Sequence, residues 1–160
     1  DVRVINTSSY MHRFAKVKDL DFGFEKEYSP SLAYNNSKLY TIWMTRYLAR
    51  KFFLNGSSIT VNSYHPGLIA TNLVNNSDTK PTKRSVLGHT MKPIPKGLDE
   101  GIKTGYYLSL SEEISGLTGY YFDDKKVKAV SEKGYTFEKA QKLMNYCQEK
   151  IDLFKEKQDV

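Results

Sequence analysis

The chain has 160 residues, which fits a single domain, and it carries a formal net charge of +6. With 39% hydrophobic and 26% charged residues, its composition is typical of a folded domain and excludes an intrinsically disordered chain. The sequence has no apolar run of about eighteen residues that would predict a membrane-spanning helix, and its single cysteine, Cys147, excludes an intrachain disulfide.

Charged and metal-binding residue types form no pattern that predicts a nucleic-acid or metal site. Basic and acidic residues are interleaved, and the aromatic residues do not alternate with basic ones as a base-stacking surface requires. The three histidines are dispersed, so we expect no bound metal. The densest basic region, which we interpret as a solvated loop with an anionic membrane or a phosphate as the alternative partner, contains Lys80, Lys83, Arg84, Lys92 and Lys96.

The first third of the chain predicts a strand, a loop and a long helix. Residues 2–8 form an apolar, β-branched run that is typical of a buried strand. Residues 10–31 show no clear period and predict a loop that contains at most one short helical turn. Apolar residues then recur at helical spacing from 33 to 54, and Asn55-Gly56 is a typical helix stop signal.

The rest of the chain predicts a strand, a loop, a helix, a strand and a helix. We place these elements, in that order, at residues 58–64, 72–96, 97–110, 119–123 and 137–154. The loop is polar and rich in proline, a composition found in lids and binding loops. The helix over 97–110 carries an apolar stripe made of Leu98, Ile102, Tyr106 and Leu110. Cys147 falls on the apolar stripe of the last helix, which favours a packing role over a reactive one.

Strands that alternate with helices predict an α/β fold, in which right-handed helical crossovers join parallel strands. We expect a doubly wound, Rossmann-type sheet, of which residues 1–160 supply the C-terminal half of one domain. A sheet of only three parallel strands is small for a class that is normally covered on both faces. Because the sequence also enters a strand directly after Asp1, we expect that another segment precedes it.

The most informative pattern for chemistry is Tyr34-Asn35-Asn36-Ser37-Lys38, at the start of the long predicted helix. Residues four positions apart lie on the same helical face, so the phenol and the ammonium are expected to be neighbours. A free tyrosine has a pKa of about 10, and a nearby ammonium favours its phenolate form. The pair is therefore a plausible proton-transfer unit, although this spacing on its own is common among ordinary surface residues.

The surrounding segments make this interpretation more specific. Ser8 and Ser9 end the strand that precedes the helix, and the segment 65–71 follows the next strand. In open parallel sheets, ligands bind beyond the carboxyl ends of the strands. We therefore expect Ser9, Tyr34 and the segment 65–71 to converge on one edge of the sheet.

With these segments in this order, the sequence resembles the short-chain dehydrogenase/reductase family over nearly its whole length, and retinol-dehydrogenase-like members most closely. The weakest of the matching segments resembles the family's last core strand. In chain order the segments are Val4–Ser9, Ala33–Lys38, Val61–Gly67 with Thr71, and Gly116–Phe122.

The resemblance implies a catalytic role for Ser9, Tyr34 and Lys38. Tyr34 would exchange a proton with the substrate oxygen, Lys38 would favour the phenolate and hold the cofactor ribose, and Ser9 would hydrogen-bond the same oxygen. Ser8 competes with Ser9 for that role, and we favour Ser9 because the family's serine is usually the second of such a pair. The cofactor, NAD or NADP, would contact Tyr34, Lys38, Pro66, Gly67, Ile69 and Thr71.

The family's glycine-rich pyrophosphate turn and its Asn-Asn-Ala-Gly motif do not occur in the sequence. The function we expect is that of an NAD(P)-dependent oxidoreductase that interconverts a lipophilic alcohol and its aldehyde or ketone. The alternative is a non-catalytic fragment or pseudoenzyme of the same fold that binds a partner. By itself, this half is not expected to bind a dinucleotide well.

The resemblance also bears on partners and location. We expect a small lipophilic substrate, no nucleic acid, and a cytoplasmic protein for which peripheral membrane association stays open. A homodimer is compatible with the family's habit of pairing subunits through the long helix. For such pairing, exposure of Trp43 or Tyr47 is one possibility.

Overall fold

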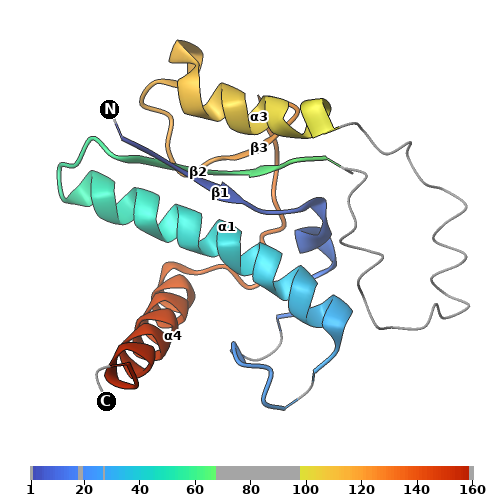
Figure 1. Cartoon of the computed structure of the whole chain (residues 1–160), viewed down its shortest axis with the longest axis vertical. Coiled ribbons are helices and arrows are strands. Elements are labelled where there is room, and N and C mark those ends of the chain that lie inside the picture. The colour runs from blue at the N-terminus through green and yellow to red at the C-terminus, as the bar shows by residue number, and fades with distance from the viewer. Residues whose placement is uncertain (1, 18–19, 27, 68–97, 159–160) are drawn as a thin grey trace, which may run out of the picture.

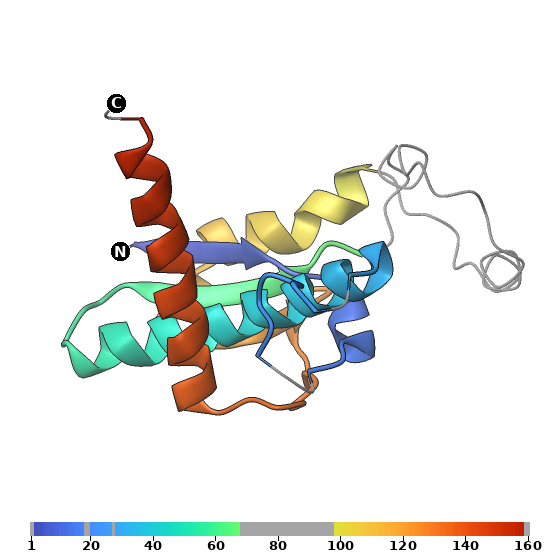
Figure 2. The ribbon, with the colours of Figure 1, turned by 90° about the horizontal axis from the view of Figure 1, so that it is seen from below.

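The computed structural model describes residues 2–17, 20–26, 28–67 and 98–158, with the backbone alone for 98–100. Its centre is a sheet that is covered by helices on both faces (Figure 1). Helix α3 (Leu98–Leu110) lies on one face, and helix α1 (Pro30–Leu54) lies on the other. Helix α4 (Phe137–Glu156) packs outside α1 and crosses it at a steep angle (Figure 2).

The sheet has the strand order β1-β2-β3-β4 in the described part of the chain. Strands β1 (Arg3–Thr7) and β2 (Thr60–His65) are parallel, and β2 is also parallel to β3 (Tyr121–Asp123). Each parallel pair is joined through a helix, as the alternation of strands and helices predicted. The predicted α/β fold with a parallel core is therefore confirmed.

Strand β4 (Lys126–Val127) was not predicted. It pairs antiparallel with β3 across a tight turn, in which Asp124 and Lys125 have φ values of 49° and 61°. Two consecutive left-handed residues are typical of a two-residue hairpin turn, most often built from asparagine, aspartate or glycine. Periodicity could not reveal a strand of two exposed residues.

Helix α1 begins at Pro30, three residues before the predicted start. The Ser29 hydroxyl accepts a hydrogen bond from the Leu32 N–H, and Pro30 occupies the first helical turn, where its missing N–H costs nothing. The helix ends at Leu54 as predicted, and Gly56 follows in the left-handed conformation with a φ of 66°.

Helix α1 is apolar on two faces, and both are covered by other elements of the chain. One face covers the sheet, while Trp43 and Tyr47 on the other face are only 1% and 8% exposed. The Tyr47 ring stacks on Phe137 of α4 with a centroid distance of 5.0 Å. Exposure of Trp43 and Tyr47 for subunit pairing is therefore wrong, because α4 covers them. The cluster between these helices contains Ala15, Leu39, Tyr40, Trp43, Tyr47, Ala140 and Leu143.

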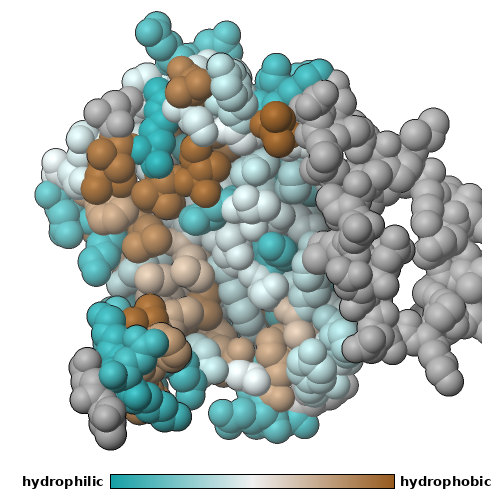
Figure 3. Space-filling view, viewed as in Figure 1, coloured by the Kyte–Doolittle hydropathy of each residue, from teal (hydrophilic) through white to brown (hydrophobic). Residues whose placement is uncertain are grey.

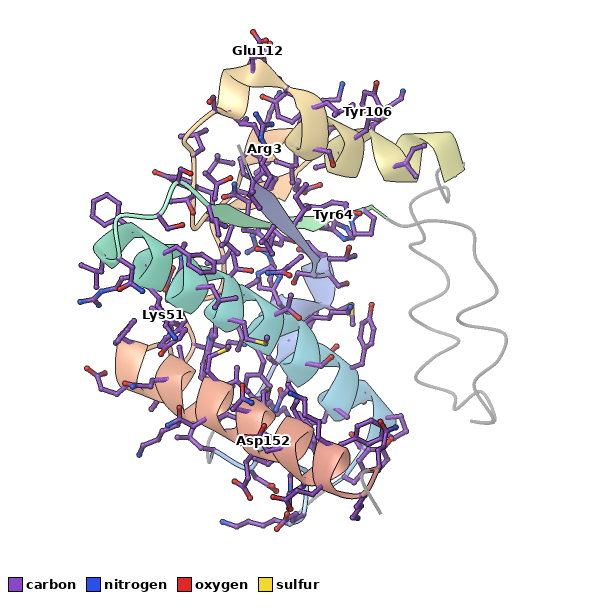
Figure 4. All side chains as sticks on the ribbon, turned by 60° about the vertical axis from the view of Figure 1, so that its left-hand side comes forward. Arg3, Lys51, Tyr64, Tyr106, Glu112 and Asp152 are labelled. Carbon is purple, nitrogen blue, oxygen red and sulfur yellow. The ribbon has the colours of Figure 1, made fainter. Side chains whose placement is uncertain are left out.

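Helix α3 is present as predicted, but its apolar stripe faces outward. Ile102, Tyr106 and Leu110 are each more than 60% exposed, whereas Thr104 and Leu108 are buried against the sheet. Figure 4 shows Tyr106 on the outer side of α3, and in Figure 3 hydrophobic residues are visible over this part of the molecule. A shallow hollow of about 460 Å³ on this surface is lined by Ile102, Lys103, Tyr106, Tyr107, Leu110, Ser111 and Lys125.

Two short 3-10 helices, η1 (Tyr10–Phe14) and η2 (Glu112–Ile114), complete the described elements. Helix α4 is buried only in its first half, since Ile151 and Phe154 are exposed. Cys147 is half-buried beside the α1–α4 cluster, and burial raises the pKa of its thiol, as expected for a packing role. None of the described helices is both long and apolar enough to cross a lipid bilayer.

Candidate active site

The predicted site residues meet at the edge of the sheet where β1 and β2 end. The parallel register pairs Thr7 with Tyr64, so both strands finish at the same level. Helix η1 and the first turns of α1 lie at this edge, on the right in Figure 1. The convergence follows from the parallel topology, because β1, β2 and β3 point their carboxyl ends the same way.

Lys38 connects the start of α1 to the end of β1. Its ammonium nitrogen donates a hydrogen bond to the Thr7 carbonyl oxygen at 3.3 Å. The same nitrogen lies 5.6 Å from the centre of the Tyr34 ring, one helical turn earlier. The Tyr34 side chain is 38% exposed, so solvent or a ligand can reach it. The structure thus places the phenol, the ammonium and the end of β1 in one group.

Ser8 and Ser9 differ in what their hydroxyls do. The Ser8 hydroxyl is buried and donates a 2.8 Å hydrogen bond to the Lys38 carbonyl oxygen. The Ser9 hydroxyl accepts a hydrogen bond from the Met11 N–H at 3.2 Å, as the cap of η1. In the described part of the chain, the Ser9 hydroxyl hydrogen has no acceptor. Ser8 therefore fastens β1 to α1, whereas the hydroxyl hydrogen of Ser9, which is also buried, is unused among the described residues.

The remaining predicted residues lie on the turn after β2. Pro66 and Gly67 are half-buried there, and Gly67 has a φ of 88°, a conformation that strongly favours glycine. Ile69 and Thr71 lie outside the described residues, as does the predicted loop over 72–96 with its basic residues. No hydrogen bond between Ser9 and Tyr34 occurs among the described residues, so the structure brings them to one edge without joining them directly.

Sequence reasoning missed two residues that hold the site together. The Asn36 side chain accepts from the Lys16 N–H at 2.9 Å and donates to the Lys16 carbonyl at 3.0 Å. His12 is fully buried, and its Nδ1 lies 2.7 Å from the Ser9 carbonyl oxygen. A polar residue on the buried face of α1, next to Tyr34, was the available signal for Asn36. Nothing in the local pattern singled out His12.

The face of the sheet that α3 covers is fastened by a separate group of contacts. Arg3 donates to the carbonyl oxygens of Leu108 and Ser111, at 3.3 and 2.8 Å, which ties β1 to the end of α3. Tyr64 lies under α3, close enough to Gly105 that an added Cβ there would come within 3.0 Å of its hydroxyl. Figure 4 labels Arg3 and Tyr64 on this side of the sheet. These contacts position β1 and β2, and hence the edge that carries the site.

Comparison with known proteins decides the family. Retinol dehydrogenase 14 of Mus musculus is 31% identical over 153 residues, which are 96% of this chain and 45% of that protein. The short-chain dehydrogenase TIC 32 B, chloroplastic, of Brassica napus is 32% identical over 153 residues, 94% of this chain and 47% of that protein. The chain belongs to the short-chain dehydrogenase/reductase family. It spans less than half the length of these two relatives.

Family models and solved structures provide two further comparisons for this family member. No protein-family model matches the chain. Among solved structures, NADPH-bound carbonyl reductase from chicken fatty liver is 24% identical, with a TM-score of 0.47 over 80% of this chain and 42% of that one. The predicted family is thus confirmed by the relatives, while the roles of Ser9, Tyr34, Lys38 and the cofactor-contacting residues stay predictions.

Proposed function

We propose that this chain is the catalytic, C-terminal part of an NAD(P)-dependent oxidoreductase that interconverts a lipophilic alcohol and its aldehyde or ketone. The observation that carries the proposal is the position of the Lys38 ammonium, between the Tyr34 ring and the Thr7 carbonyl. This arrangement supports the proposal because it groups a phenol and an ammonium where β1 ends. The names of the relatives support an alcohol or carbonyl as the substrate class.

In the proposed reaction, a bound nicotinamide supplies or accepts the hydride. During reduction the Tyr34 hydroxyl gives its proton to the substrate oxygen, and during oxidation the phenolate takes the proton back. The Lys38 ammonium lies 5.6 Å from the centre of the Tyr34 ring, so its positive charge stabilises the negative charge that develops on the phenol oxygen during the reaction. The Ser9 hydroxyl donates a hydrogen bond to the same oxygen and stabilises its developing negative charge.

The described residues suit the nicotinamide side of such a cofactor. Lys38 uses one of its N–H groups on Thr7 and, being only half-buried, keeps others for ribose hydroxyls. Gly67 has no Cβ, so its backbone at the end of β2 can approach a cofactor closely. Ile69 and Thr71 remain part of the proposed contact set. We assign the pyrophosphate to a glycine-rich turn in another part of the protein.

The position of β1 on the outer side of the described sheet supports the proposal that the sheet continues beyond it. β1 is the outermost strand of the described sheet (Figure 2), and all of its residues are at least partly exposed. Its neighbour β2 is buried over four of its six residues. An apolar strand such as Val4-Ile5 is typical of the interior of a parallel sheet rather than of an edge. We propose that a further parallel strand, from a nucleotide-binding half, pairs with β1.

The proposal is tested on the full-length protein with Tyr34→Phe. We expect this variant to lose nearly all oxidation of NADH or NADPH with a retinoid aldehyde or another apolar carbonyl, because the proton donor is gone. Tyr28→Phe is the matched control, since Tyr28 precedes α1, is exposed and makes no hydrogen bond among the described residues. Unchanged turnover in Tyr34→Phe, with normal folding, would remove the proposed mechanism.

A further inference from the structure

The turn that carries Ser9 rests on a buried histidine. The Ser9 carbonyl oxygen accepts two hydrogen bonds from His12, one from its backbone N–H at 3.2 Å and one at 2.7 Å from its ring Nδ1. A carbonyl oxygen can only accept, so the hydrogen of the neutral ring must be on Nδ1. The structure thereby selects one tautomer of His12.

The opposite side of the ring faces strand β3. Tyr121 contacts the His12 ring edge-on, with a centroid distance of 5.0 Å, and both side chains are buried. Neither His12 Nε2 nor the Tyr121 hydroxyl has a hydrogen-bond partner among the described residues. The ring is therefore confined between the Ser9 carbonyl and β3, and it links the turn after β1 to the third strand.

The contacts of His12 fix the backbone from which the Ser9 hydroxyl projects. Ser9 has the extended conformation of a cap residue, with φ −155° and ψ 154°, and its hydroxyl accepts from Met11. Loss of the ring contact would leave the Ser9 carbonyl with only the longer bond from the His12 backbone N–H, and would hold the direction of the Ser9 side chain less firmly. Burial is the largest influence on the pKa of His12 and lowers it, the hydrogen bond to the Ser9 carbonyl raises it, and the charge of Arg13 lowers it further. The net shift is downward, which favours the neutral ring that this tautomer requires.

We propose that His12 is a positioning residue, which holds the Ser9 carbonyl through its Nδ1–H so that the Ser9 hydroxyl faces the substrate oxygen. This inference rests on the proposed role of Ser9 in the reaction. It assigns His12 no contact with substrate or cofactor. Its effect on the rate passes entirely through Ser9.

A pair of substitutions separates the donor from the bulk of the ring. In His12→Asn the side-chain amide nitrogen can take the place of Nδ1, whereas His12→Leu fills the space without a donor. In the full-length protein, we expect His12→Leu to lower kcat on the order of tenfold, the rate equivalent of one hydrogen bond, with an unchanged KM for the cofactor. We expect His12→Asn to keep most of the activity. Equal losses in both variants would overturn the proposal.

A double-mutant cycle tests whether His12 acts through Ser9. Once Ser9→Ala has removed the hydroxyl, adding His12→Leu should cost no further activity. A second, independent loss in the double variant would show that His12 acts by another route. If Ser9→Ala alone is fully active, the proposed function of Ser9 fails instead, and the two failures are distinguishable.

Two further measurements cover the case in which His12→Leu fails to fold. Phe122→Leu, at an equally buried position on β3, controls for loss of packing and should lower stability without the change in kcat. Nitrogen-15 NMR of histidine-labelled wild-type protein, with His12→Asn used for assignment, should show His12 at neutral pH with its hydrogen on Nδ1. A hydrogen on Nε2, or on both nitrogens, would refute the inference without any variant that must fold.

Discussion

The contrast between Ser8 and Ser9 gives a sharp prediction, because the two neighbouring hydroxyls have different partners. Ser8→Ala removes the 2.8 Å hydrogen bond to the Lys38 carbonyl, a loss of about 1 kcal/mol from the free energy of unfolding. Ser9→Ala removes the cap on the Met11 N–H, which costs about 1 kcal/mol as well. The two variants are therefore expected to have similar stabilities.

Their activities should differ widely. The loss of a donor to the reacting oxygen lowers kcat by about 100- to 1,000-fold, so Ser9→Ala should be almost inactive. Ser8→Ala should keep kcat within a few-fold of the wild type. Urea denaturation of the full-length protein gives the first comparison, and steady-state kinetics give the second. Similar kcat losses in both variants, or a larger loss in Ser8→Ala, would refute the assignment of the donor to Ser9.

The remaining predictions concern the supports of the site. Asn36→Leu removes both hydrogen bonds to Lys16 and should lower the free energy of unfolding by about 2 kcal/mol in urea denaturation; an unchanged midpoint would contradict this. Tyr121→Phe deletes a buried hydroxyl that has no partner in the described part, so stability should stay equal or rise by up to about 1 kcal/mol, and a clear loss would reveal an unseen partner. His12 has a lowered pKa in the folded state, so its unfolded form binds a proton first as the pH falls. The contribution of neutral His12 to the free energy of unfolding is complete above pH 6.5, the ordinary pKa of histidine, and is lost as the pH falls below that value. The difference in unfolding free energy between wild type and His12→Asn should therefore shrink on acidification. A constant difference would argue against a buried neutral ring.

Much of the fold could be predicted because its elements follow simple periods. The runs that predicted β1, α1, β2, α3, β3 and α4 all overlap the observed elements, although the three strands begin one or two residues later than predicted. The errors arose where a residue's surroundings depend on distant segments. Exposure of Trp43 to solvent was one possibility, yet α4 covers it, and the outward stripe on α3 has the spacing of a buried one. Spacing identifies a face of a helix, but not what lies against that face.

In the site, too, local patterns predicted some residues, while others depend on contacts with distant segments. Ser9, Tyr34 and Lys38 could be named because strand ends and a four-residue helical spacing bring them to one edge. His12 and Asn36 could not, because their partners are set by how η1 packs against β3 and α1. The distinction between Ser8 and Ser9 likewise needed a structure, since only the Lys38 carbonyl shows that one of the two hydroxyls is engaged.

The central claim concerns a single substrate oxygen that is contacted by two side chains of this chain. A crystal structure of the full-length protein with a nicotinamide cofactor and an unreactive alcohol tests it most directly. We predict that the Ser9 and Tyr34 hydroxyls both lie about 3 Å from the alcohol oxygen, with the Lys38 ammonium on the cofactor ribose. An alcohol bound away from Tyr34, or Lys38 turned from the ribose, would contradict the account.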